Sequence, residues 1–398
     1  MYLFFIRRFP DLDHFFPIIY HLAKDYGVPV SILCQNPDFK IHDDFILNFL
    51  KKEFGIPAGY THNVDQSFFR HIVLKIFLKS RRIHPGLGTR LFNVYHHLPF
   101  HEKWAENLLA KLNPSLVIMD FNQSSYLSTG RIVEVSRKRG TPVVLMTHGV
   151  TMRLSGLGRV DDIPMADYNI LPNKMKMNYY QTNGAPVQHI NILGAPRYCA
   201  EWERTYNNIL ENAFSCPDLP QGDGKLKVLY FERPMIGLDS RHEAYKTVER
   251  LDFVHSVFKE RLEKKNPYYK STETPYPSAR LIQWADVVVM SVSSIALEVL
   301  WHDKPLLFLK YLSPAGEVCA FDKYEACWPI HSKDELIEAI KTLRENPDYR
   351  PYKKENVIQL FRDFVYNGDE NKNIIEDHIQ FFRDIAAGPE DGEFPQRH

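Results

Sequence analysis

Short apolar runs alternate with helical patterns from the first residues onward. Tyr2–Ile6 is a continuous apolar run, which suits a strand covered on both faces. A loop is expected over Arg7–Asp13, and apolar residues at helical spacing predict a helix over Phe15–Tyr26 that ends at Gly27. Val30–Cys34 is the next strand. A strand–helix–strand opening of this kind predicts a parallel sheet.

The same alternation continues through the rest of the chain. Further strands are expected at Leu116–Met119, Pro142–Met146, Tyr168–Leu171, within Val187–Leu193, and at Lys227–Phe231, Val287–Met290 and Pro305–Leu309. Helices are expected through much of residues 40–110 and at Gly130–Arg139, Ile295–His302, Ser332–Glu345, Asn356–Phe364 and Asn373–Ile385. The predicted class is therefore α/β, with doubly wound sheets.

The length of the chain predicts two domains. One hydrophobic core seldom organises 398 residues. We expect an N-terminal, acceptor-side domain over residues 1–175 and a C-terminal, nucleotide-binding domain over 176–375. A last helix and a loose tail would occupy 376–398. Gly and Pro content places the linker between about 172 and 224.

Charge and cysteine usage narrow the function classes. Lys+Arg and Asp+Glu number 49 each, so no overall positive field favours a nucleic acid. The five cysteines form no CxxC pair, which argues against a disulfide framework or a thiolate zinc site. No clear acidic metal motif stands out, and we expect neither a metal nor a cofactor. The absence of a signal segment or a long apolar run predicts a cytoplasmic protein.

The first candidate site is the run Ser291-Val292-Ser293-Ser294, which joins a strand to a helix. Free amides at a helix start and serine hydroxyls are donors that suit a phosphate. Glu298 stands one turn further, where its carboxylate could accept from ribose hydroxyls. The structural alternative is that one serine caps the helix and Glu298 is a surface acid.

The segment ADVVVMSVSSIALEVLWHDKPLLFL, residues 285–309, resembles the donor site of GT-B proteins. It is similar to UDP-N-acetylglucosamine 2-epimerases that do not hydrolyse their substrate and to CDP-glycerol glycerophosphotransferase-like enzymes. The resemblance implies a GT-B fold, two Rossmann-like domains facing a central cleft. It also implies that Ser293 and Ser294 hold the diphosphate and that Glu298 holds the ribose. The epimerases normally carry Gly-Gly where Ser293-Ser294 stand, which weighs against an epimerase.

Three residues are candidates for the catalytic base. His148, in Thr147-His148-Gly149, follows a strand and matches a His-Gly of the glycerophosphotransferase-like group. His14, in Asp13-His14-Phe15-Phe16-Pro17, matches the His-x-x-Pro of many GT-B transferases. Asp120, at the end of Leu116–Met119, is a rival. The alternatives are a structural His148, and an Asp13 helix cap with a solvated His14.

Two arginines complete the predicted nucleotide site. Arg197, in Gly194-Ala195-Pro196-Arg197, matches a turn that follows the hinge strand in the same protein group, and its guanidinium could fork onto a phosphate. Arg233 follows the strand Lys227–Phe231 and would face the same diphosphate. Each arginine could instead form a structural ion pair, with Glu232 as the expected partner of Arg233.

These features predict a metal-independent glycosyltransferase. The donor would be a UDP- or CMP-linked sugar, and the acceptor a saccharide or lipid-linked precursor of a surface polysaccharide. Transfer of a polyol phosphate from a CDP donor, epimerisation and a non-catalytic binding or scaffold role are the alternatives. The basic, apolar segment Phe68–Arg82 raises the further hypothesis of peripheral contact with the inner face of the membrane.

Overall fold

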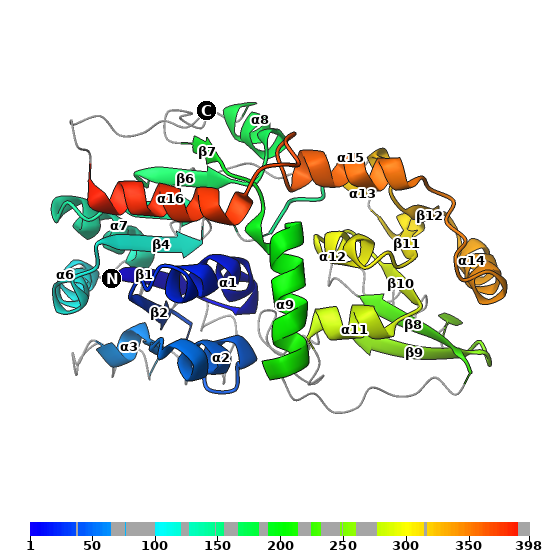
Figure 1. The fold of residues 1–398 in the computed structure, drawn as a ribbon, viewed down its shortest axis with the longest axis horizontal. Helices are drawn as coiled ribbons and strands as arrows, with labels where there is room; N and C mark the ends of the chain where they lie inside the picture. The colour runs from blue at the N-terminus through cyan, green and yellow to red at the C-terminus, as the bar shows by residue number, and fades with distance from the viewer. Residues whose placement is uncertain are drawn as a thin grey trace. The chain divides into compact units, whose positions relative to one another are not determined.

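A computed structural model of the chain (Figure 1) shows two compact units, each with its own sheet. It describes residues 1–36, 39–64, 76, 100–120, 127–147, 149–154, 166–182, 190–213, 224–231, 247–248, 250–259, 277–313 and 317–388. The first unit consists of Met1–His148, Val160–Arg197 and Asn373–His398, and the second of Gly149–Arg159 and Tyr198–Lys372. The boundary at 197/198 lies within the expected linker region. It differs from the expected domain end at 175, and the last helix belongs to the first unit.

The first unit is built on a parallel sheet of seven strands in the order β3-β2-β1-β4-β5-β6-β7. The strands are β1 (Tyr2–Ile6), β2 (Val30–Cys34), β3 (Ala58–Tyr60), β4 (Leu116–Asp120), β5 (Val143–Met146), β6 (Tyr168–Leu171) and β7 (Ile190–Ile192). The chain runs outward from β1 to β3 and then returns to β4 on the other side of β1. The point between β1 and β4 is therefore the topological switch point of this sheet.

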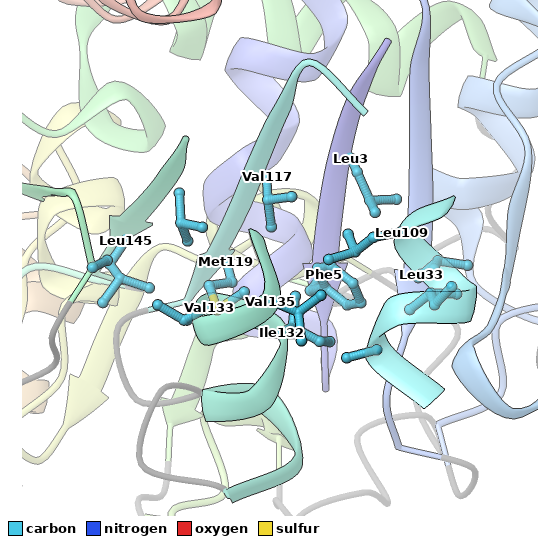
Figure 2. Close-up of a cluster of buried hydrophobic side chains, with 14 of the residues drawn as sticks. Leu3, Phe5, Leu33, Leu109, Val117, Met119, Ile132, Val133, Val135 and Leu145 are labelled. Atoms are coloured by element: carbon cyan, nitrogen blue, oxygen red, sulfur yellow. The ribbon is translucent and has the colours of Figure 1, made fainter. Parts of the chain in front are cut away.

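Helices cover both faces of this sheet. They are α1 (Phe9–Lys24), α2 (Phe45–Phe54), α3 (Thr61–Val64), α6 (Phe100–Leu112), α7 (Leu127–Lys138), α8 (Lys174–Thr182) and α16 (Ile374–Ala387). Leu3 and Phe5 of β1 belong to one core cluster with Leu109 of α6 and Ile132 of α7 (Figure 2). Phe4 points to the opposite face because side chains alternate along a strand.

The opposite face is closed by the first and last helices together. The ring of Phe4 lies 5.6 Å from that of Phe15 in α1 and 6.5 Å from that of Phe382 in α16. Phe381 packs edge-on against Tyr168 of β6 at 5.7 Å. In Figure 1 α16 is the red helix lying against this sheet, so the two ends of the chain share one core.

The first helix begins earlier than the sequence pattern indicated. The expected loop Arg7–Asp13 is wrong, because α1 already starts at Phe9 and Asp13 lies inside it. Pro10 is compatible with the first turn, where a missing N–H costs nothing. Asp11 stabilises this start by accepting a hydrogen bond from the Arg7 amide at 2.8 Å.

The second unit is built on a parallel sheet of five described strands in the order β12-β11-β10-β8-β9. They are β8 (Leu226–Phe231), β9 (Val254–Lys259), β10 (Val287–Met290), β11 (Leu306–Leu309) and β12 (Trp328–Ile330). The helices are α9 (Ala200–Ala213), α11 (Ser278–Trp284), α12 (Ile295–Trp301), α13 (Ala320–Lys323), α14 (Lys333–Glu345) and α15 (Lys354–Phe364), with the 3-10 turn η4 (Lys310–Leu312). The 3-10 turn η3 (Pro196–Tyr198) contains the boundary between the units at 197/198. The switch point of this sheet lies between β8 and β10.

The expected linker region is largely structured. Residues 172–224 include α8, β7 and α9, and α9 buries Trp202, Tyr206 and Leu210 along one side. These three residues recur at helical spacing in the sequence, but the Gly and Pro content of the surrounding segment led to the prediction of a linker. No described helix is long and apolar enough to cross a membrane. Apart from Ile76, the segment Phe68–Arg82 lies outside the described residues.

Truncation of the fully buried Phe382 to alanine tests the shared core of the first unit. We expect the variant to lose about 3–5 kcal/mol of unfolding free energy in urea titrations, because a large cavity opens beside Phe4. Phe382→Leu should lose clearly less, and Ala387→Ser at the exposed end of α16 close to nothing. A loss below about 1 kcal/mol for Phe382→Ala would contradict this packing.

Candidate functional site

The serine run lies at the switch point of the second sheet. Met290, the last residue of β10, pairs in register with Phe231, the last residue of β8. Ser291 therefore leaves the sheet at the edge where β8 also ends. Open α/β sheets bind ligands in the crevice outside the carboxyl ends of strands at such a point.

The hydroxyls of this run have different surroundings. Ser291 is 9% exposed, and its buried hydroxyl oxygen has no hydrogen-bond partner among the described residues. Ser293 accepts from the Ile295 amide at 3.4 Å, and Ser294 accepts from the Tyr198 hydroxyl at 3.0 Å. Ser294 occupies the N-cap position of α12 without a side-chain cap, so the simple capping alternative does not describe it.

Glu298 is the one acid in the first turn of α12, and it is 2% exposed. The alternative of a surface acid is therefore wrong. Burying a carboxylate costs free energy unless hydrogen bonds or opposite charges compensate for the lost water. The burial of Glu298 therefore indicates a specific role for its carboxylate.

An ion-pair cluster occupies the switch point of the first sheet. Arg7 follows β1 and donates from Nη2 to Oδ1 of Asp120, the last residue of β4, at 3.0 Å. Asp11 of α1 accepts from Arg7 Nε at 3.4 Å and lies 3.5 Å from Arg8 Nε. Asp11 and Asp120 are both fully buried. The cluster therefore joins the ends of β1 and β4 through a fixed guanidinium.

Arg197 and the Asp13-His14 pair come together in this unit. Arg197 Nε donates to Asp13 Oδ1 at 2.9 Å, and the arginine side chain is 4% exposed. This is the structural ion pair that the sequence left open for Arg197. His14 is buried in α1 rather than solvated.

Asp44 is another buried acid near this pair. It caps α2 by accepting from the Leu47 amide at 3.0 Å. Burial raises the pKa of its carboxyl to about 6, although the amides of Leu47 and Ile46 oppose the shift, and the charge of Asp13 adds to it.

Two predicted residues lie outside the described part of the chain. His148 follows Thr147 after the end of β5, and Arg233 stands two positions after β8. Sequence reasoning missed Arg7, Arg8 and Asp11 because it assigned them to a loop. The sequence feature that could have identified them is the pair of arginines, Arg7-Arg8, directly after the buried strand β1.

The described cysteines do not form a nucleophilic site. Cys34, Cys199, Cys319 and Cys327 are buried, and burial raises the pKa of each thiol. A buried thiol of this kind is inert because the thiolate is the reactive form. Among the described residues, no group of three or more His, Cys, Asp or Glu side chains could hold a metal ion.

Comparison with known proteins establishes the fold. No protein-family model and no curated protein matches the chain. A putative UDP-N-acetylglucosamine 2-epimerase from Listeria monocytogenes is 13% identical with a TM-score of 0.58, over 100% of this chain and 98% of its own. The S. aureus MnaA–UDP co-structure has the same identity and TM-score over 100% and 99%. The glycotransferase of kitacinnamycin is 12% identical with a TM-score of 0.51, over 95% and 98%. The predicted GT-B fold, of the UDP-N-acetylglucosamine 2-epimerase-like type, is confirmed.

Replacing Arg7 with methionine tests the first-unit cluster. We expect a loss of about 3 kcal/mol in unfolding free energy, because the buried Asp120 carboxylate loses this guanidinium. Arg131→Met removes an exposed ion pair with Glu134 and should cost less than about 1 kcal/mol. The double variant Arg7→Met/Asp120→Leu should recover part of the loss. If Arg7→Met and Arg131→Met lose the same unfolding free energy in chemical denaturation, burial does not make the Arg7 ion pair more important than an exposed one.

Asp44→Asn tests the raised pKa of that carboxyl. The folded-state pKa of about 6 exceeds the ordinary 3.8, so stability from Asp44 is fully present below about pH 4 and lost as pH rises through 6. Asparagine caps a helix equally well and carries no charge. The variant should therefore match the parent near pH 4 and exceed it by up to about 3 kcal/mol at pH 7. A stability difference that does not change with pH would contradict the shift.

Proposed function

We propose that the chain is a UDP-sugar enzyme of the 2-epimerase type. The observation that carries the proposal is the serine run at the switch point of the second sheet, in a chain whose fold extends over the whole length of proteins solved with UDP or UDP-N-acetylglucosamine. Such an enzyme inverts the configuration at C2 of the sugar of a nucleotide-sugar substrate.

The second unit would hold the nucleotide. Hydroxyls of Ser291, Ser293 and Ser294 would donate to the diphosphate, and the carboxylate of Glu298 would accept from the ribose. The buried Ser291 hydroxyl supports this role, because an unpartnered buried donor is costly until a ligand satisfies it. Arg233, two residues beyond β8, would add a charge on the phosphate side.

The first unit would act on the sugar. Asp120 ends β4 at the switch point, where its Oδ1 accepts from the Arg7 guanidinium at 3.0 Å. The C2 proton is not acidified by a carbonyl, so its removal would require the C1–O bond to UDP to break at the same time, which leaves a C1–C2 double bond and free UDP. Protonation of C2 from the other side and return of the UDP oxygen to C1 would complete the inversion, so a base and an acid are required. Asp120, His14 and His148 are the candidates for these roles. Arg197 would support the site through Asp13 rather than by contact with the diphosphate.

Glycosyl transfer is the second candidate. Ser293-Ser294 stand where the epimerases normally carry Gly-Gly, and a glycotransferase shares the fold. In that case the same base would accept the proton of an acceptor hydroxyl, and the acceptor would be a saccharide or a lipid-linked sugar. In either reaction Arg233 would balance the charge of the leaving nucleotide.

The two reactions differ in which bond to hydrogen is broken. Incubation with UDP-N-acetylglucosamine in D₂O, followed by proton NMR, should show the C2 epimer and loss of the C2 proton signal. Release of UDP that requires an added acceptor, without exchange at C2, would identify a transferase instead. If UDP and UDP-N-acetylglucosamine fail to raise the melting temperature, the proposal of a UDP-sugar enzyme is wrong.

Ser291→Ala separates ligand binding from stability. Because the hydroxyl has no partner among the residues that the structure describes, its removal should leave the unfolding free energy unchanged or raise it by about 1 kcal/mol. UDP affinity, measured by calorimetry, should fall about tenfold, because the variant loses one hydrogen bond to a charged phosphate.

Ser332→Ala is the matched control. Ser332 caps α14 by accepting from the Glu335 amide at 3.1 Å. Its loss should cost about 1 kcal/mol of stability and leave UDP affinity unchanged. If Ser291→Ala behaves like this control, the hydroxyl has no role in binding.

A further inference from the structure

A lysine follows the strand next to the serine run in the second unit. Lys310 is the first residue after β11, which is the neighbour of β10 on the side away from β8. Met290, the last residue of β10, pairs in register with Phe308, and β11 ends one residue later at Leu309. Ser291 and Lys310 therefore leave neighbouring parallel strands at the same edge of the sheet.

Lys310 lies on the face of the sheet that carries α12. The ring of Phe321 in α13 packs edge-on against that of Phe308 at 5.0 Å, so α13 covers the face to which Phe308 points. α15 contacts both helices, because aromatic rings lie 5.7 Å apart at the C-terminal end of α13 and 6.4 Å apart at that of α12. Lys310 Nζ lies 2.9 Å from Oδ2 of Asp322 in α13. Its ammonium group is therefore in the layer that includes the helix after the serine run.

The ion pair with Asp322 holds Lys310 in place and leaves it accessible. The side chain of Lys310 is 41% exposed and that of Asp322 is 16% exposed. Pairs this exposed add little to stability, because water and salt screen them. An ammonium group has three N–H donors, so Lys310 can contact Asp322 and an anion at the same time.

A diphosphate held by the serine run requires positive charge as well as hydroxyl donors. The serine hydroxyls are neutral, and Glu298 in the first turn of α12 adds a carboxylate. Arg233 would supply charge from the β8 side, but it lies outside the described residues. Lys310 is a described cation on the β11 side. Hydrogen bonds from an ionised donor to phosphate are roughly twice as strong as those from a neutral one.

We propose that Lys310 is a phosphate-binding residue of the nucleotide site and that Asp322 is a positioning residue for its ammonium group. The identity of the ligand as a nucleotide rests on the proposed function, whereas the placement of Lys310 rests on the strand register and the ion pair. A lysine acts on a phosphate as a point charge. Lys310 therefore contributes to affinity for the phosphates and not to recognition of the base.

Titrations with UDP and with uridine test the role of Lys310. Lys310→Met should weaken UDP binding at least about tenfold in calorimetry, because a hydrogen bond to a charged phosphate is lost. Uridine, titrated by NMR, should bind both proteins equally, because it carries no phosphate. Lys310→Arg keeps the charge and should retain most of the UDP affinity. Added salt should weaken UDP binding less in Lys310→Met than in the parent.

The sign of the Asp322→Asn effect tests the positioning role. An acid that merely lies near a bound phosphate repels it, so its neutralisation would tighten UDP binding. A positioning acid has the opposite effect, and Asp322→Asn should weaken UDP binding about threefold, because the freed lysine must be ordered on binding. In the Lys310→Met background the same change should cause no further loss. Tighter UDP binding by Asp322→Asn in the parent would overturn the positioning role.

Lys341→Met is the matched control. Lys341 Nζ lies 2.8 Å from Glu338 on α14, and its side chain is 48% exposed, so the pair resembles that of Lys310. The control should leave UDP affinity unchanged, and both methionine variants should keep the melting temperature within about 3 °C of the parent. If Lys310→Met binds UDP as tightly as this control does, or loses UDP and uridine affinity by the same factor, Lys310 is not a phosphate-binding residue.

Inorganic pyrophosphate separates this proposal from the proposed function. A parent that binds pyrophosphate but not UDP, with pyrophosphate binding weakened by Lys310→Met and not by Lys341→Met, would refute the UDP-sugar enzyme and support the anion-binding role of Lys310. A parent that binds UDP with an affinity that Lys310→Met does not change would support the enzyme and refute the role of Lys310. A parent that binds neither compound would refute both.

Discussion

The direction of the parallel strands determines where the polar groups at the two switch points lie. Most strand residues in both sheets are apolar and buried, and these polar groups stand at the carboxyl ends of the strands. In a parallel sheet all carboxyl ends meet at one edge. The Arg7–Asp120 pair lies at this edge where β1 and β4 diverge, and Ser291 lies at the equivalent point between β10 and β8. The topology thereby concentrates the chemistry of each unit at one place.

Much of this layout could be predicted from the amino-acid sequence. Short, largely apolar runs predicted β1, β2, β6 and β10 with the bounds that the structure shows. Local rules were sufficient there, because a short buried strand needs only a few consecutive residues that are mostly apolar. Local rules also predicted α14, because Ser332 is a typical N-cap residue and accepts from the Glu335 amide. The GT-B resemblance followed from one such strand and the serines after it.

Local sequence rules could not predict which residues pair with the polar side chains. Asp120 is paired with a residue 113 positions away, and Asp13 with one 184 positions away. Such pairs depend on strand order, which hydrophobic periodicity does not specify. The start of α1 was missed for a related reason, since Asp11 supports it through Arg7 and β4. Short or partly polar strands such as β9 and β12 also lacked a distinct signal.

The return of α16 to the first unit has a consequence for synthesis on the ribosome. Domains usually fold as units while the chain emerges from its N-terminus. Here the rings of Phe4 and Tyr168 receive Phe382 and Phe381 only after the whole of residues 198–372 has been translated. The second unit can therefore be complete while the first sheet still lacks α16, and its aromatic face is covered by α1 alone. That interval is the time at which a molecular chaperone would be most useful to this chain.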